Sequence, residues 1–226
     1  AVNYDNITVG TTVEIIEAYF DRMAQQPMPM QPYHLVVAAM PLLGVRIDKC
    51  DTYSRLTLAE IYGDTLKNLS ERQATWLDST VWLNRGTHFE AWVLPVEAQL
   101  APAFAVCAGD LDGDGHEDLF LSQNFFALPP DTSRYDAGRG LCLRGDGTGG
   151  FAAVAGQDSG IRVYGEQRGA ALCDFDGDGR VDLAVTQNAA ETKLYRNLAA
   201  RPGLRVRLRG SPGNPEAIGA TIRVGT

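Results

Sequence analysis

Two short acidic segments carry the side chains with the clearest chemical potential in this sequence. They are GDLDGDGHEDLFL at residues 109–121 and CDFDGDGRVDLAV at residues 173–185. Counted from the first Asp that follows the opening residue, each segment has Asp at positions 1, 3, 5 and 9, and Gly at positions 4 and 6. Glycine lets the backbone curl, so alternate carboxylates converge. The carboxylates are Asp110, Asp112, Asp114 and Asp118 in the first segment, and Asp174, Asp176, Asp178 and Asp182 in the second.

Carboxylates crowded in this way repel one another unless a cation lies between them. Two unit charges about 4 Å apart repel by roughly 4 kcal/mol at an effective dielectric constant near 20. Oxygen-only ligands on a flexible loop favour Ca²⁺ over Mg²⁺, which needs a smaller and stricter octahedron. The backbone carbonyls of His116 and Arg180, at position 7, are expected to complete the ligand set. The sequence therefore predicts two Ca²⁺ sites.

An EF-hand is the first alternative to such a calcium loop. It requires a bidentate Glu at position 12 and flanking helices. Position 12 is Leu121 in one segment and Val185 in the other, both inside β-prone apolar runs, so an EF-hand is excluded. The remaining alternative is a pair of Asp-Gly turns solvated by water.

The sequence offers no catalytic residue. The three histidines, His34, His88 and His116, lie far apart, and no G-x-S-x-G, H-E-x-x-H or phosphate-loop pattern is present. The Asp segments are poor general acids, because a carboxylate bound to Ca²⁺ has a lowered pKa and holds no proton near neutral pH.

The elements that must position these carboxylates are short strands. From about Ser79 onward, β-prone runs are separated by Gly, Asp and Asn clusters. They are TVWLN, FEAWVL, DLFLSQ, GLCLRG, IRVYG, DLAVTQ, KLYRN and LRVRLRG. The order of an apolar run, an acidic loop, a strand, a variable stretch and another strand occurs twice. Such repetition of a unit of four short strands is typical of β-propeller blades.

The first third of the chain has a helical pattern. In TTVEIIEAYFDRMA, Thr11 and Glu14 match a capping box, and apolar residues follow on one stripe. A second helix is expected in YHLVVAAMPLLG, ending at Pro41 or Gly44, and a third after the Thr57–Glu60 capping pair. The prolines of QQPMPMQP predict a linker between the first two helices.

The acidic segments resemble the FG-GAP or VCBS repeats of integrin-type β-propellers, whose blade loops bind calcium. The stretch from VWLNRG to GHEDL resembles bacterial members of that family, and LRVRLRGSPGNPEAIGATIRVGT resembles the start of their ASPIC/UnbV segment. The resemblance implies a helical region over residues 1–77, packed on or inserted in the propeller. Calcium-binding blades would follow over 78–200, and an ASPIC/UnbV-like segment over 201–226 would complete the last blade.

The expected fold class is therefore mainly β, with propeller-like blades and an N-terminal helical region. Two complete blades can be counted, plus the closing strands of a preceding one near residues 79–97. A propeller usually closes with four to eight blades, so a partial or open propeller is expected. The free edges near TVWLN and LRVRLRG would allow a homo-oligomer to form.

Composition limits the partners of the chain. The formal net charge is −8, and no block of Lys and Arg could neutralise phosphates, which excludes nucleic acid. The longest apolar run is broken by Pro41, so no membrane span is expected. The four cysteines form no C-x-x-C pair, which leaves free thiols and one disulfide both open. The RGD at residues 144–146 suits a tight hairpin better than an adhesion motif.

These observations predict a non-catalytic, calcium-binding module that acts as an extracellular or periplasmic binding or scaffold domain. Its signal peptide is expected to lie outside this chain, and its ligand would be a protein or a carbohydrate. The alternative is an accessory or catalytic domain of a secreted carbohydrate-active enzyme. Four aromatic residues would then form a sugar-stacking platform, although packing in a core or at a blade interface is the more common role. They are Trp76, Trp82, Trp92 and Phe89.

Overall fold

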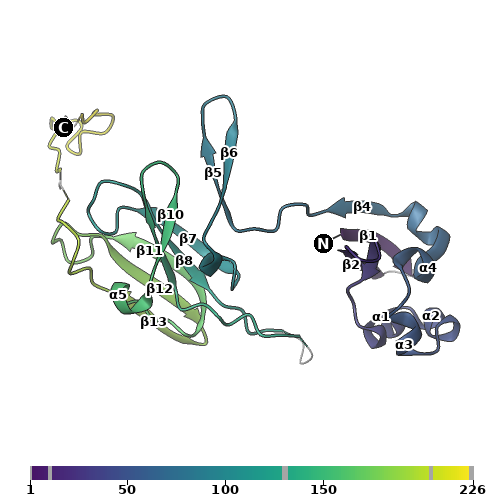
Figure 1. The fold of residues 1–226 in the computed structure, drawn as a ribbon. Helices are drawn as coiled ribbons and strands as arrows, with labels where there is room; N and C mark the ends of the chain where they lie inside the picture. The colour runs from purple at the N-terminus through teal and green to yellow at the C-terminus, as the bar shows by residue number, and fades with distance from the viewer. Residues whose placement is uncertain (1, 10–11, 129–131, 204–205, 224–226) are drawn as a thin grey trace. The chain divides into compact units, whose positions relative to one another are not determined.

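The computed structural model describes residues 2–9, 12–128, 132–203 and 206–223 (Figure 1). It divides into two compact units, Ala1–Leu77 and Asp78–Thr226. Both are built on small antiparallel sheets, and the few short helices lie mostly in the first unit. The mainly β fold class is thereby confirmed. Within the described ranges, none of the helices has the length and apolar character needed to cross a membrane.

The first unit contains a four-stranded antiparallel sheet in the order β3-β2-β1-β4. Its strands are β1 (Val2–Val9), β2 (Thr12–Asp21), β3 (Gln26–Pro29) and β4 (Ser70–Gln73). The predicted helix in TTVEIIEAYFDRMA is therefore wrong, since most of that segment is β2. The linker prediction is wrong for residues 26–29, which pair with β2. Thr11 of the predicted capping box lies outside the described residues.

The error over β2 has a clear physical cause. Ile16 and Ala18 are buried, whereas Ile15, Glu17 and Tyr19 are exposed, so burial alternates with a period of two. β-branched and aromatic side chains pack well on a pleated sheet. The apolar residues of this segment fit a helical stripe and a strand face almost equally, and pairing with β1 and β3 selects the strand.

Short helices follow this hairpin. They are α1 (Tyr33–Ala39), α2 (Pro41–Arg46), α3 (Cys50–Tyr53), α4 (Leu58–Tyr62) and the 3-10 helix η1 (Gly63–Asn68). The predicted stop at Pro41 is confirmed, because α1 ends before it and Pro41 opens α2. The Thr57–Glu60 capping box is also confirmed: the N–H of Thr57 donates to the Glu60 carboxylate at 2.8 Å, and the N–H of Glu60 donates to Thr57 Oγ1 at 3.3 Å. The helices and the sheet share one core, formed by Ile16, Ala18, Val36, Ile47, Tyr53, Leu58, Ile61 and Tyr62.

The second unit begins with a hairpin of β5 (Thr80–Asn84) and β6 (Phe89–Val93), followed by the short helix η2 (Val96–Ala98). A four-stranded antiparallel sheet comes next, in the order β10-β9-β8-β7. Its strands are β7 (Ala103–Gly109), β8 (Asp118–Gln123), β9 (Leu141–Gly145) and β10 (Phe151–Val154).

After the short helix α5 (Gly156–Ser159), a three-stranded sheet repeats the start of this pattern. Its strands are β11 (Glu166–Cys173), β12 (Asp182–Asn188) and β13 (Ala190–Tyr195), in that order. The register is the same in both sheets: Gly109 lies opposite Asp118, and Cys173 lies opposite Asp182. Strand β11 packs beside β7 and β8. One core therefore joins the two sheets, and it includes Phe120, Cys142, Ile161, Val163, Leu183 and Val185.

Two predicted strands are not formed. The IRVYG segment, residues 161–165, has no strand, and neither do residues 206–210 of LRVRLRG, whose residues 204 and 205 lie outside the described part. Within the described residues, the second sheet ends at β13 and has no counterpart of β10. Over the ranges that the structure describes, no closed propeller is present.

The remaining local predictions have clear outcomes. All four cysteines are free, which answers the disulfide question, and Cys142 is buried. The hairpin interpretation of RGD is confirmed, because β9 and β10 pair on either side of residues 146–150.

Candidate metal centres

Each acidic segment connects the first two strands of its sheet. Loop 1 is defined as residues 110–118, between β7 and β8, and loop 2 as residues 174–182, between β11 and β12. In loop 1, Asp110, Asp112 and Asp118 each offer a carboxylate oxygen, and these atoms all lie within 4.8 Å of one another. Asp174, Asp176 and Asp182 form the same triad in loop 2. In the part of the chain that is described, these are the only such groups of three or more His, Cys, Asp or Glu side chains.

The Asp at position 9 anchors each loop to its sheet. Asp118 and Asp182 begin β8 and β12, and they are only 3% and 1% exposed. In loop 1, the N–H groups of Leu111 and Gly145 both donate to the Asp118 carboxylate at 2.9 Å. The equivalent donors to Asp182 are the N–H groups of Phe175, at 3.0 Å, and Asn197, at 2.8 Å. This carboxylate therefore ties the start of loop 1 to the last residue of β9, and the start of loop 2 to Asn197, two residues after β13.

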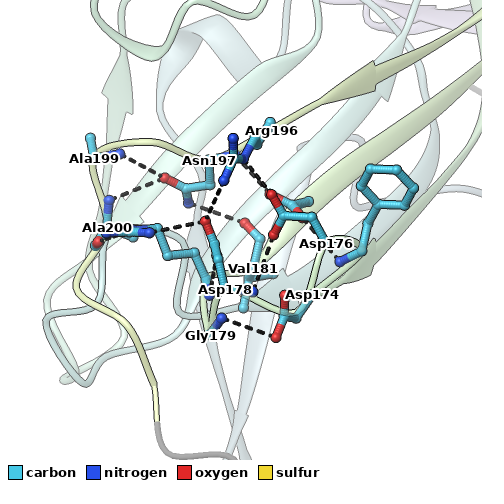
Figure 2. A network of polar contacts seen from close by, with 12 residues as sticks. Asp174, Asp176, Asp178, Gly179, Val181, Arg196, Asn197, Ala199 and Ala200 are labelled. Carbon is cyan, nitrogen blue, oxygen red and sulfur yellow. Dashed lines mark hydrogen bonds and ion pairs between the residues drawn. The ribbon is translucent and has the colours of Figure 1, made fainter.

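The first and third positions are held by the backbone of the loop itself. The N–H of Gly115 donates to Asp110 at 2.9 Å, and the N–H of Asp114 donates to Asp112 at 3.1 Å. Loop 2 has the same two bonds, from Gly179 to Asp174 at 3.1 Å and from Asp178 to Asp176 at 3.2 Å (Figure 2). The glycines at positions 4 and 6 all have positive φ, between 76° and 92°, which side chains other than glycine rarely adopt. The predicted curl of the loops is confirmed.

The fifth position does not join the triad in either loop. Asp114 and Asp178 instead accept the N–H of position 7, each at 2.9 Å. Asp178 also accepts from the guanidinium of Arg180 at 2.9 Å. A second guanidinium, that of Arg196, lies 3.2 Å from the same carboxylate (Figure 2). The N–H of Arg180 is the main cause of the lowered pKa of Asp178, and the two guanidinium groups add to it. Three of the four predicted carboxylates thus converge in each loop, and the position 7 carbonyls of His116 and Arg180 stay predicted ligands.

Two arginines that were not among the predicted site residues pair with the triads. Arg144 Nε lies 2.6 Å from Asp112 Oδ2, and Arg196 pairs with Asp176 in the same way. Both arginines directly precede the residue that donates its N–H to the position 9 Asp. The signal was therefore present in the sequence, as LRG in one repeat and YRN in the other. These guanidinium groups offset part of the carboxylate repulsion but do not remove it.

The geometry suits a hard divalent cation. Three carboxylates from one loop meet at one point, with oxygen as the only ligand atom, and water could complete a shell of six to eight oxygens. Backbone N–H groups of the loop donate to the carboxylates and orient them toward one another. Compared with known proteins, the chain matches no family model, no curated protein and no solved structure.

Two of the four aromatic residues predicted to form a sugar-stacking platform lie exposed on one face of a hairpin. Trp82 and Phe89 lie on the same face of the β5-β6 hairpin, since Trp82 pairs with Ala91 and Phe89 with Asn84. They are 52% and 64% exposed, so core packing is wrong for these two rings, and packing at a blade interface stays a prediction. Trp76 is half exposed as well, and Trp92 lies on the opposite face of the hairpin.

Proposed function

We propose that this chain is a calcium-binding module of the FG-GAP/VCBS type, with one Ca²⁺ in each Asp loop. The observation that carries this proposal is the convergence of two identical carboxylate triads on the same hydrogen-bond frame. Two solvated turns of independent origin would have no reason to share these bonds. Ca²⁺ is favoured over Mg²⁺ because the loop supplies several oxygens without a compact octahedral cage.

The sheets β7-β10 and β11-β13 are proposed to be neighbouring blades of a partial or open propeller. Three features support this: the same strand order, the same loop between the first two strands, and the packing of β11 beside β7. In this proposal the calcium ions stabilise the blades of an extracellular or periplasmic binding or scaffold domain that has no catalysis of its own. Its ligand is a protein or a carbohydrate, and its free strand edges allow self-association.

Thermal unfolding in Ca²⁺ and in chelator tests the metal sites. With a dissociation constant of about 10⁻⁴ M, about 1 mM Ca²⁺ should stabilise each site by roughly 1.4 kcal/mol. Asp112→Ala and Asp176→Ala should each remove about half of the Ca²⁺-dependent rise in Tm. Asp158→Ala, at an exposed Asp in α5, is the matched control and should leave the rise unchanged.

The metal proposal has a clear contrary outcome. Mg²⁺ at the same concentration should reproduce little of the effect, because its octahedral shell fits the loops poorly. If chelation leaves Tm unchanged and calorimetry detects fewer than one Ca²⁺ per chain, the loops are solvated turns.

A carbohydrate ligand, or a carbohydrate-active enzyme, is the second candidate. It is favoured by the exposed Trp82 and Phe89 side chains on one face of the β5-β6 hairpin, since aromatic rings stack on sugar faces. A glycan array separates the two roles. Capture of a sugar without turnover supports a binding module, and release of a shortened product supports an enzyme.

A further inference from the structure

The seven residues after Arg196 contact both Asp loops. This bridging segment, residues 197–203, reaches loop 1 through Asn197, whose side-chain amide donates to the carbonyl of Leu111 at 2.7 Å. The N–H of Arg201 adds a longer bond of 3.4 Å to the carbonyl of Asp112. Loops that are far apart in the sequence therefore share one short stretch of chain.

The same segment holds loop 2. The amide of Asn197 also donates to the carbonyl of Val181 at 3.1 Å, and the backbone N–H of Asn197 donates to Asp182 at 2.8 Å. From loop 2, Arg180 Nε donates to the carbonyl of Ala200 at 2.8 Å. Loop 2 is therefore hydrogen-bonded to the bridging segment at both Asn197 and Ala200.

The orientation of Asn197 is set by its own carbonyl as well. Its Oδ1 accepts the N–H groups of Ala199 and Ala200 at 3.2 and 3.1 Å. Both polar atoms of the side chain are therefore hydrogen-bonded. The amide nitrogen donates to the two loops, and the amide oxygen accepts from the bridging segment. Any movement of one loop must either break a bond to Asn197 or carry the side chain with it.

Packing leaves little room for the segment to move without the loops. A Cβ added to Gly113 of loop 1 would lie 2.6 Å from the backbone nitrogen of Arg201. In loop 2, a Cβ added to Gly179 would lie 3.3 Å from Pro202 and from the carbonyl of Gly203. Ala200, which directly precedes these contacts, is buried.

We infer that Asn197 is a positioning residue that couples the two loops, so that order in one favours order in the other. The consequence for cation binding is that the two sites bind Ca²⁺ with positive cooperativity, and this part of the inference rests on the proposed function. The first ion fixes its loop and, through Asn197, the bridging segment. The second ion then binds a loop whose ordering has already been achieved in part.

Calorimetric titration of the full chain with CaCl₂ tests the coupling. Disabling site 1 by Asp112→Ala should weaken the remaining site about fivefold or more relative to its affinity in the doubly loaded chain. Disabling site 2 by Asp176→Ala should weaken site 1 by the same factor, because binding linkage is reciprocal. Site affinities that stay within twofold in both variants, or that rise, overturn the inference.

Two variants of Asn197 identify the residue responsible. Asn197→Asp keeps the acceptor for Ala199 and Ala200 but loses both donors to the loops, and Asn197→Ala loses all of these bonds. Both should reduce the coupling factor toward one. Asn214→Ala is the matched control, since the amide of Asn214 closes a local turn to Ile218, and it should keep the full factor. If Asn197→Asp retains the coupling, Asn197 is not the positioning residue.

Hydrogen exchange gives a readout that does not require a metal. In chelator, Asp182→Asn in loop 2 should speed exchange of the Gly113, Asp114 and Gly115 amides in loop 1 several-fold. Unchanged exchange there overturns the coupling even if both loops bind Ca²⁺. If neither loop of the wild-type chain binds Ca²⁺, the proposed function and the cooperativity fail together, and faster exchange in loop 1 would still support the coupling of the loops.

Discussion

Loops 1 and 2 have nearly the same backbone hydrogen bonds but different charged partners. In loop 1, position 7 is His116, Glu117 adds a further carboxylate, and Arg144 pairs with Asp112. In loop 2, position 7 is Arg180, which pairs with Asp178. Arg196 then pairs with both Asp176 and Asp178 (Figure 2). The Asp and Gly positions set the shape of the site, whereas the residues between and beyond them set its charge.

This difference separates the geometric and the electrostatic contributions to cation binding. Both triads offer the same oxygens, so their intrinsic ligand sets are equal. Loop 1 is the more negative of the two, and we expect it to bind Ca²⁺ more tightly. Variants of the glycines and carboxylates that both loops have in common should have the largest effects on stability or affinity, and variants of the charged partners the smallest.

The largest effect is expected where loop 1 approaches the bridging segment most closely. Gly113→Ala adds a Cβ 2.6 Å from the backbone of Arg201 and also strains a residue at φ 76°. We expect it to lower the free energy of unfolding by about 3 kcal/mol in urea denaturation. Gly115→Ala has similar backbone strain at φ 92° but open space around its Cβ, and should cost about 1 kcal/mol. Equal costs for the two variants would show that the close approach is unimportant.

The next largest effect is expected for loss of the buried carboxylate at position 9, which is Asp118 in loop 1 and Asp182 in loop 2. Asp118→Asn and Asp182→Asn each replace an acceptor of two backbone N–H groups with an amide that can turn its own donors toward them. In chelator, each should cost about 2 kcal/mol of stability. Asp114→Asn, outside the triad, should cost less than about 0.5 kcal/mol. A large difference between Asp118→Asn and Asp182→Asn would contradict the common frame.

Exchanging the residues at position 7 should alter affinity by a smaller amount. Arg180→His removes a positive charge beside Asp178, and should tighten Ca²⁺ binding in loop 2 about threefold, a change of about 0.7 kcal/mol. His116→Arg should weaken loop 1 by a similar factor. Calorimetry at low salt measures both, and high salt should reduce the two effects. If neither variant changes its dissociation constant, the residues at position 7 do not set the affinity difference.

The smallest effect is expected for the two arginines in the absence of cations. The Arg144 and Arg196 side chains are 60% and 56% exposed, so solvent screens their ion pairs. Arg144→Gln should cost less than about 0.5 kcal/mol in chelator. Arg196→Gln should cost somewhat more, because Arg196 serves two carboxylates rather than one. Urea denaturation of the two variants side by side measures this order. A larger cost for Arg144→Gln than for Arg196→Gln would mean that the second ion pair of Arg196 adds no stability.

The accuracy of prediction from sequence depended on how local the relevant contacts are. The convergence of Asp side chains at positions 1, 3 and 9, the positive-φ glycines and the Thr57–Glu60 cap involve residues close together in the sequence, and their spacing predicted them. The β2 strand was missed because its pairing with β1 and β3 outweighs the local helical pattern. Arg144 and Asn197 were missed because they reach the loops only after the sheet has formed.

The Asp at position 5 of each loop shows a finer limit of prediction from sequence. Sequence spacing treats Asp114 and Asp178 as equal members of the ligand set, yet each accepts the N–H group two residues further on. These hydrogen bonds depend on the path of the loop backbone and cannot be read from residue types, and Asp114 and Asp178 stay predicted ligands. The strand expected in LRVRLRG, residues 204–210, is not formed over the described residues 206–210, since β-prone side chains do not form a strand without a paired neighbour.

The buried Cys142 thiol in β9 offers a chemical probe of this architecture. Burial, with a smaller contribution from the charge of Asp118, raises the pKa of Cys142 to about 12. The thiolate is the reactive form, so alkylating reagents should leave this side chain unmodified while the sheets stay packed. Cys142 lies opposite Phe120, in the core that β11 and β12 help to close. The rate at which a maleimide labels Cys142 would therefore report how often the two sheets separate, without any added fluorophore.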